Sequence, residues 1–262
     1  MVTLASIARR EVSGRIDSGL SSLVLLERGK WVRQAVDLAI GGIEVEPIPA
    51  CLCEGQNAIL VSNYPSVAST LRAVMKVSCR LPGEQMRLKA IARPEVVKDA
   101  NVALKALGIA KFVFPVQKNE DGAYKMDRPV LRQVLAHLNG RGNVLWLSIT
   151  GRTRGNGLLE ADLRTGAALF SVKTGIPIVP MGLVTRTRGG KPSVAKVRFG
   201  APIQPAAAAE MGDFEKSDYL FDLSRLAMCQ VARLLPPGQR GDLENADEKL
   251  AETERRLMAC RL

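Results

Sequence analysis

Short apolar segments that alternate with amphipathic segments are the feature that most constrains the fold of this chain. The apolar segments are rich in Val, Ile and Leu, as are strands buried on both faces of a parallel sheet. Most of the intervening segments have helical periodicity and end at glycine, a common helix stop. Strands are predicted at 58–62, 87–92, 111–116, 144–149, 176–184 and 195–199, and helices at 65–77, 95–106, 127–139, 160–174 and 217–235.

This alternation predicts an α/β fold with a mostly parallel central sheet flanked by helices. The chain has 262 residues, of which 47% are hydrophobic, which fits one large domain with helical additions. We divide it into an N-terminal helical segment (1–42), an α/β domain (43–240) and a charged helical tail (241–262). The basic, amphipathic N-terminal helices could pack across the sheet or lie on a membrane surface.

The formal net charge of +11 favours polyanionic partners: an anionic membrane surface, a phosphorylated small substrate or nucleic acid. Nucleic acid is the least favoured, because no interleaved aromatics, helix-turn-helix pattern or zinc module is present. No uncharged apolar run approaches the roughly 18 residues of a membrane-spanning helix. We therefore expect a cytoplasmic protein, peripheral on the inner face of the membrane if it contacts one. Five scattered cysteines and one histidine predict no metal site and no tightly bound cofactor.

The loop after the fourth predicted strand is rich in glycine and arginine. Ligands of open α/β sheets bind beyond the carboxyl ends of strands, which is where this loop lies. Its backbone N–H groups and guanidinium groups suit a phosphate. The loop begins with Thr150, Gly151, Arg152, Thr153 and Arg154.

Four segments of the chain follow one another in a distinctive order. Asn63 and Ser66 follow the first strand as Asn-x-x-Ser, and Gly-Ile-Ala-Lys-Phe-Val-Phe-Pro occupies 108–115. The Gly-Arg loop comes next, and 164–184 then contains a Gly-Ala helix before a Gly-Ile-Pro-Ile-Val-Pro strand. This layout resembles the glycerol-phosphate and lysophospholipid acyltransferase family over roughly residues 30–240, most specifically at 164–184. The resemblance implies an acyltransferase-like α/β fold.

The resemblance also implies a reaction. In the family, a histidine removes the proton of a glycerol hydroxyl and an aspartate orients that histidine. The oxygen then attacks an acyl thioester of coenzyme A or acyl carrier protein. Against the family's Asn-His-x-Ser-x-x-Asp block, Tyr64 stands at the histidine and Ser69 at the aspartate. Against Pro-Glu-Gly-Thr-Arg, Thr150 stands at the glutamate. The implied catalytic positions are Tyr64 and Ser69, and the implied substrate- or phosphate-binding residues are Asn63, Ser66, Thr150, Gly151, Arg152, Thr153 and Arg154.

These replacements predict altered chemistry. Tyrosine, with an unperturbed pKa of about 10, is a poor base at neutral pH. Loss of a general base typically costs about 10² to 10⁴ in rate. We therefore interpret the chain as an acyltransferase-like protein that binds an acyl chain or a phosphorylated glycerolipid such as a lysophospholipid, with weak or no transfer. Two alternatives stay open: an active acyltransferase with a divergent site that uses acyl-CoA or acyl-ACP, and a basic nucleic-acid-binding protein.

Two structural expectations follow for the site. An apolar groove should reach Tyr64, and the loop at 151–154 should line the same cleft. The only histidine, His137, is expected to be a helix-end residue and not a relocated base.

Overall fold

The computed structural model describes residues 34, 37–38, 40–81, 88–92, 112–118, 124–150, 156–206 and 213–259. These residues form a seven-stranded sheet in the order β1-β9-β8-β2-β7-β3-β4, with a separate β5–β6 pair. The strands are β1 (Glu44–Val45), β2 (Ala58–Ser62), β3 (Leu88–Ala92), β4 (Val113–Pro115), β5 (Gln117–Lys118), β6 (Tyr124–Lys125), β7 (Val144–Ser148), β8 (Ile178–Arg188) and β9 (Lys191–Phe199).

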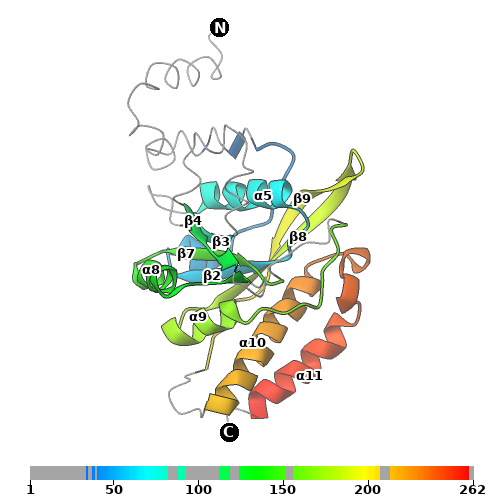
Figure 1. Ribbon diagram of the computed structural model, residues 1–262. Helices are drawn as coiled ribbons and strands as arrows, with labels where there is room; N and C mark the ends of the chain where they lie inside the picture. Colours follow the sequence, from blue (N-terminus) through cyan, green and yellow to red (C-terminus); the bar gives the residue numbers. More distant parts are fainter. Residues whose placement is uncertain are drawn as a thin grey trace, which may run out of the picture.

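Helices cover both faces of this sheet (Figure 1). Helix α5 packs on one face, and α8, α9 and α10 pack on the other. The sheet is parallel except for the β8–β9 pair. The predicted α/β fold with a mostly parallel central sheet is therefore confirmed. The helices are α4 (Ala50–Cys53), α5 (Val67–Arg80), α8 (Arg128–Asn139), α9 (Gly166–Thr174), α10 (Asp213–Arg233) and α11 (Ala246–Ala259), with short 3₁₀ helices at Pro237–Gln239 and Gly241–Leu243.

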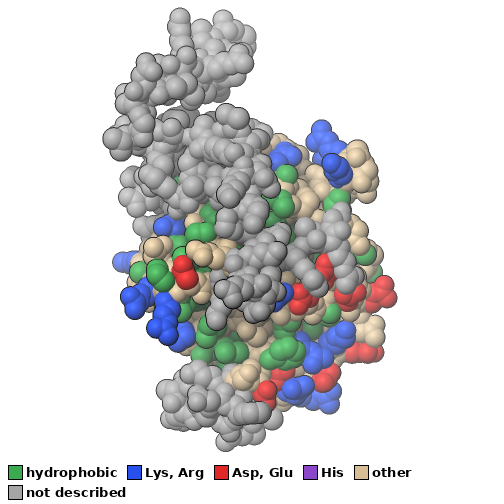
Figure 2. Space-filling model, viewed as in Figure 1, with side chains coloured by type: hydrophobic (Ala, Val, Ile, Leu, Met, Phe, Trp, Pro, Cys, Tyr) green, Lys and Arg blue, Asp and Glu red, His purple; other side chains and the backbone are tan. Residues whose placement is uncertain are grey.

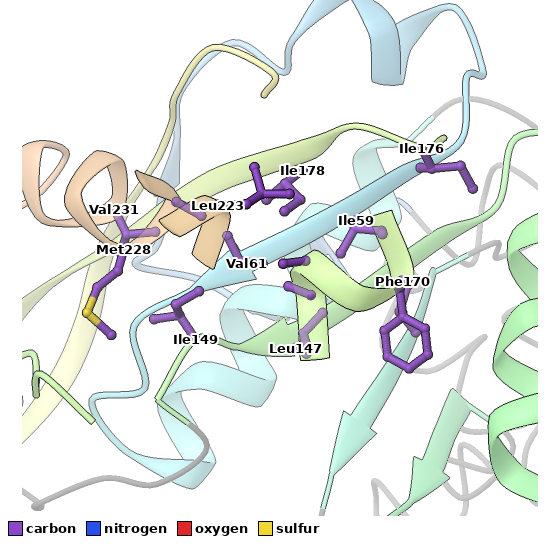
Figure 3. Packing of buried hydrophobic residues seen from close by; sticks show 14 of the residues in the cluster. Ile59, Val61, Leu147, Ile149, Phe170, Ile176, Ile178, Leu223, Met228 and Val231 are labelled. Carbon is purple, nitrogen blue, oxygen red and sulfur yellow. The ribbon is translucent and has the colours of Figure 1, made fainter. Parts of the chain in front are cut away.

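Strand β2 is the centre of the core. All five of its residues are buried, and it pairs in parallel with both β7 and β8. Ile59 and Val61 point into the cluster formed with α9 and α10, as Figure 3 shows, whereas Leu60 points into the cluster under α5. Burial on both faces explains why this strand appears in the sequence as an uninterrupted apolar run.

The predicted strands at 58–62, 87–92, 111–116 and 144–149 are confirmed, with differences only at their ends. The helix predicted at 160–174 is wrong in its first part, because α9 begins at Gly166. The preceding segment has no regular secondary structure and is bonded to other parts of the chain. The Leu159 N–H donates to the Gln239 carbonyl at 3.3 Å, and the Arg164 N–H to the Ile149 carbonyl at 3.2 Å. The predicted helix at 95–106 and almost all of the segment 1–42 lie outside the described residues.

Strands β8 and β9 are longer than the predicted 176–184 and 195–199, since they continue as an antiparallel hairpin to the Gly189-Gly190 turn. At the other end of the fold, α11 packs along α10. Leu250 and Leu257 of α11 are buried, and Arg256 pairs with the buried Asp222 of α10 at 3.1 Å. The boundaries at residues 42 and 240 remain predictions from sequence.

A buried lysine attaches the chain before β1 to helix α5. The Lys76 ammonium donates to the carbonyls of Asp37, at 2.8 Å, and Ile40, at 3.0 Å, and lies 3.4 Å from the Asp37 carboxylate. The more exposed Arg80 also pairs with that carboxylate, at 3.1 Å. Because these bonds are made by a buried cation, they fix the position of the segment against α5.

We expect Lys76→Met to lower the free energy of unfolding by about 1–3 kcal/mol, because two carbonyl groups lose their donor while the aliphatic packing is kept. Urea unfolding measures this loss. Arg80→Gln is the matched control: its exposed ion pair with Asp37 should contribute less than about 1 kcal/mol. Equal effects of the two substitutions would contradict the anchoring role of Lys76.

Candidate functional site

An apolar cavity of about 400 Å³ lies where β2, β3 and β7 end. Its walls come from both sides of the sheet, because α5 contributes from one face and α8 and α9 from the other. This is the carboxyl edge of the parallel strands, where ligands of open α/β sheets bind. The lining residues are Tyr64, Leu71, Ile91, Ala92, Val116, Met126, Leu131, Trp146, Leu147, Ser148, Arg164, Thr165, Gly166, Leu169 and Phe170.

Tyr64 lies in the wall of this cavity, directly after β2, so the expected apolar groove at Tyr64 is present. Its ring is tilted by 56° against the ring of Trp146, with 6.4 Å between the centroids. A hydrogen bond fixes the position of Trp146: its indole Nε1 donates to the Ser62 hydroxyl at 3.0 Å. The Ser62 hydroxyl donates to the Asn63 carbonyl at 2.9 Å. The indole N–H thus has the partner that a buried tryptophan needs.

The polar part of the lining lies where the chain enters α9. In the part of the lining that the structure describes, the charged residue is Arg164. Its side chain is 57% exposed and pairs with Asp162 at 3.1 Å. Thr165 and Gly166 bring the first turn of α9 to the same wall. A helix N-terminus and a guanidinium group both favour negative charge. The cavity therefore combines a large apolar wall with one cationic margin, which suits an amphiphile with an anionic group.

Ser66 and Ser69 are bonded to each other. Their hydroxyl oxygens lie 2.5 Å apart in the first turn of α5, and the Ser66 hydroxyl also lies 3.4 Å from the Pro192 carbonyl. Ser66 occupies the predicted N-cap position of α5, but its side chain makes no capping hydrogen bond. Because Ser69 bonds to another hydroxyl, this pair supplies no base at neutral pH.

Asn63 points away from the cavity lining, towards β8. Its amide Nδ2 donates to the Leu183 carbonyl at 3.0 Å, and its Oδ1 accepts from the Leu183 N–H at 2.8 Å. The residue is buried, with 2% exposure. These two bonds give Asn63 a structural role at the end of β2, and its role in binding substrate stays a prediction.

Thr150 is also buried, and its hydroxyl lies 3.3 Å from the hydroxyl of Ser148, which lines the cavity. Four other predicted phosphate-binding residues lie outside the described residues: Gly151, Arg152, Thr153 and Arg154. That they line the cleft therefore stays a prediction.

The remaining candidate bases and nucleophiles lie elsewhere. His137 Nε2 is 3.1 Å from the carbonyl of Val144, the first residue of β7, which places His137 at the opposite edge of the sheet from Tyr64. Burial raises the pKa of the thiols of Cys51 and Cys229, the reverse of what activates a nucleophile. Within the described ranges, no group of His, Cys, Asp and Glu is placed to hold a metal ion.

The structure places Tyr64 in the wall of the cavity together with Arg164, Thr165 and Gly166, which are not among the predicted site residues. The reason is the helix predicted from residue 160, which would have put Arg164 inside a helix. The usable signal was Thr165-Gly166 itself, where the helix starts.

No protein-family model matches this chain, and no curated protein matches it in sequence. Among solved structures, the chain is similar to the crystal structure of the 1-acyl-sn-glycerophosphate (LPA) acyltransferase PlsC from Thermotoga maritima. The TM-score is 0.45 and the identity 16%, over 84% of this chain and 86% of that chain. Because this likeness is weak in both sequence and superposition, the functional assignment depends on the cavity and its lining.

None of the helices in the described part of the chain has both the length and the apolarity needed to cross a bilayer.

Proposed function

We propose that the protein binds the acyl chain of a lysophospholipid or another phosphorylated glycerolipid in the cavity beside Tyr64. The observation on which this rests is the apolar cavity itself, at the carboxyl edge of the sheet. Its volume of about 400 Å³ falls among small-molecule sites, which span about 300–1,000 Å³. Apolar side chains suit a hydrocarbon chain, and Arg164 at the margin suits a phosphate or carboxylate.

In this proposal the protein is an acyltransferase-like lipid-binding protein that transfers acyl groups weakly or not at all. Acyl-CoA or acyl-ACP would be the co-substrate of any residual transfer. Among the described residues that line the cavity there is no His, Asp, Glu or Lys. Tyrosine is ordinarily a poor base at neutral pH, because its unperturbed pKa is about 10. An acyl-lipid ligand also fits a peripheral protein on the inner face of the membrane.

Binding is tested directly by mass spectrometry of lipids extracted from the purified protein and by calorimetric titration with a soluble lysophospholipid. We expect a co-purifying acyl lipid or saturable binding. A protein that neither carries a lipid nor binds one in titration would refute the proposal.

The catalytic part of the proposal predicts that Tyr64→His with Ser69→Asp raises acyl transfer above that of the wild type. A general base typically contributes about 10² to 10⁴ in rate, which bounds the expected gain. The measurement is coenzyme A release from acyl-CoA with a lysophospholipid acceptor. Because Ser69 is buried, thermal unfolding of the double variant must accompany the assay. Ready wild-type turnover that disappears in Tyr64→Phe and Ser69→Ala would instead establish an active acyltransferase with a divergent site.

A further inference from the structure

A two-stranded basic arm projects from the same edge of the sheet as the cavity. We define it as residues 185–194, the outer part of the β8–β9 hairpin (Figure 1). Ser62, the last residue of β2, pairs with Met181 of β8, and β8 then continues to Arg188. Because β8 is parallel to β2, this continuation extends beyond the carboxyl edge, where the cavity lies. Gly189 and Gly190, both with positive φ, form the two-residue turn at its tip.

Three cations share one face of this arm. Arg188 lies directly opposite Lys191 in the register, and Arg186 precedes Arg188 by two residues. Directly opposed residues of an antiparallel pair, and residues two apart on a strand, point to the same side. All three side chains are exposed, and Figure 2 shows Lys and Arg side chains gathered at the tip of the arm.

This arrangement has no compensating charge within the arm. Residues 184–194 contain no Asp or Glu, and none of the three cations forms an ion pair with a described residue. Like charges directly opposite each other destabilise a strand pair. Closer to the sheet, a cation of the same hairpin is neutralised by acidic residues: Lys196 of β9 pairs with Glu44 at 3.1 Å and with Glu46 at 3.0 Å. The uncompensated charge is therefore confined to the projecting part.

The other face of the arm rests on the protein. Pro192 and Thr187 lie opposite each other on that face. The Pro192 carbonyl lies 3.4 Å from the Ser66 hydroxyl, and a side chain at Gly157 would meet Pro192 at 3.0 Å. The first contact joins the arm to the start of α5, two residues after Tyr64, and the second places it against the segment before α9. The three cations of the basic face are exposed.

We propose that the basic face of the arm, Arg186, Arg188 and Lys191, docks on the surface of an anionic lipid bilayer. The bilayer would neutralise the opposed charges of the arm, and it would meet the molecule at the edge where the apolar cavity lies. Nucleic acid fits less well, because residues 184–198 contain no aromatic side chain on which a base could stack. The proposal goes beyond lipid binding in the cavity and does not depend on it.

The test uses the full chain with Arg186→Gln, Arg188→Gln and Lys191→Gln combined, and vesicles of phosphatidylcholine with phosphatidylglycerol. Each cation near an anionic surface contributes about fivefold in affinity, so the triple variant should partition about 100-fold more weakly at low salt. Binding of the wild type should weaken as salt rises. Pure phosphatidylcholine vesicles should not distinguish the two proteins.

The matched control removes the same charge from α8 and α9, as Arg128→Gln, Arg132→Gln and Lys173→Gln. These residues are exposed, and α8 lies beside β4 at the far side of the sheet from the arm in Figure 1. We expect the control to bind vesicles within a few-fold of wild type, and the arm variant to unfold at no lower temperature than the other two proteins, because it removes like charges that face each other. If the triple variant proves unstable, Arg188→Gln alone still removes one of the opposed cations and should weaken binding about fivefold.

Two results would overturn the proposal: an arm variant that binds vesicles as well as the control does, or one that loses affinity for a DNA duplex while its vesicle binding is unchanged. Titration with a soluble lysophospholipid separates the two proposals, since an arm variant should keep ligand binding in the cavity.

Discussion

Asn63→Ala is expected to lower the free energy of unfolding by about 2–5 kcal/mol. The substitution removes both partners of Leu183 in the centre of the sheet: the oxygen that accepts from its N–H and the amide that donates to its carbonyl. Leu183 is fully buried, so no water replaces these partners, and each group left unsatisfied costs about 1–3 kcal/mol. Equilibrium unfolding in urea, followed by far-UV circular dichroism, measures the effect.

Ser66→Ala is the control for this experiment. Ser66 also belongs to the Asn-x-x-Ser segment, but its hydroxyl bonds are to Ser69 and to the Pro192 carbonyl in a partly buried setting. We expect it to cost about 1 kcal/mol or less. A stable Asn63→Ala protein that has lost lipid binding would contradict the structural role, and it would favour the substrate-binding role implied by the family resemblance.

Much of the fold was predictable because burial leaves a clear pattern in the sequence. Strand β2 is buried on both faces, and its five apolar or small residues match the predicted 58–62. The apolar pattern is absent where the strands are exposed to solvent. The outer part of β8 alternates Thr and Arg, and the outer part of β9 begins Lys-Pro-Ser, so no apolar period marks either as a strand. Their extension depends on pairing with each other and on the Gly-Gly turn.

The start of α9 was mispredicted for a related reason. The mispredicted part, 160–165, includes Leu163, a partly buried side chain whose spacing from Ala167 and Phe170 is that of a helical face. The segment instead has no regular secondary structure, and backbone groups of residues 159–161 bond to Gln239 and Asp242 near the end of the described chain. Such partners, distant in sequence, cannot be read from local periodicity.

The site was only partly predictable. Tyr64 was identified because it stands in a recognisable motif. Met126, Leu131 and Leu169 are ordinary apolar residues of segments whose periodicity already predicts core positions. The cavity of about 400 Å³ between them results from the way α8 and α9 pack at the edge of the sheet. The sequence offers no local signal for empty volume.

Gly166→Trp is expected to weaken lipid binding by about 100-fold or more while the fold is kept. Gly166 lines the cavity at the first residue of α9. A Cβ at this position would meet only the Leu147 side chain, at 3.8 Å, an ordinary contact, and the residue does not have positive φ. An indole that fills the cavity should displace at least about four methylene groups of a bound chain. At about 0.8 kcal/mol each, the affinity should fall by about 100-fold.

Gly166→Ala provides the matched control, because a methyl group fits without entering much of the cavity. It should leave lipid affinity within a few-fold of wild type and raise stability by up to about 1 kcal/mol, since alanine favours the helix. Calorimetric titration with a soluble lysophospholipid, beside thermal unfolding of each variant, gives both measurements. A folded Gly166→Trp protein that binds the lipid as tightly as the alanine variant would show that the acyl chain lies elsewhere. Loss of lipid binding in the tryptophan variant alone would place the acyl chain of the lipid in this cavity, independently of any activity at Tyr64.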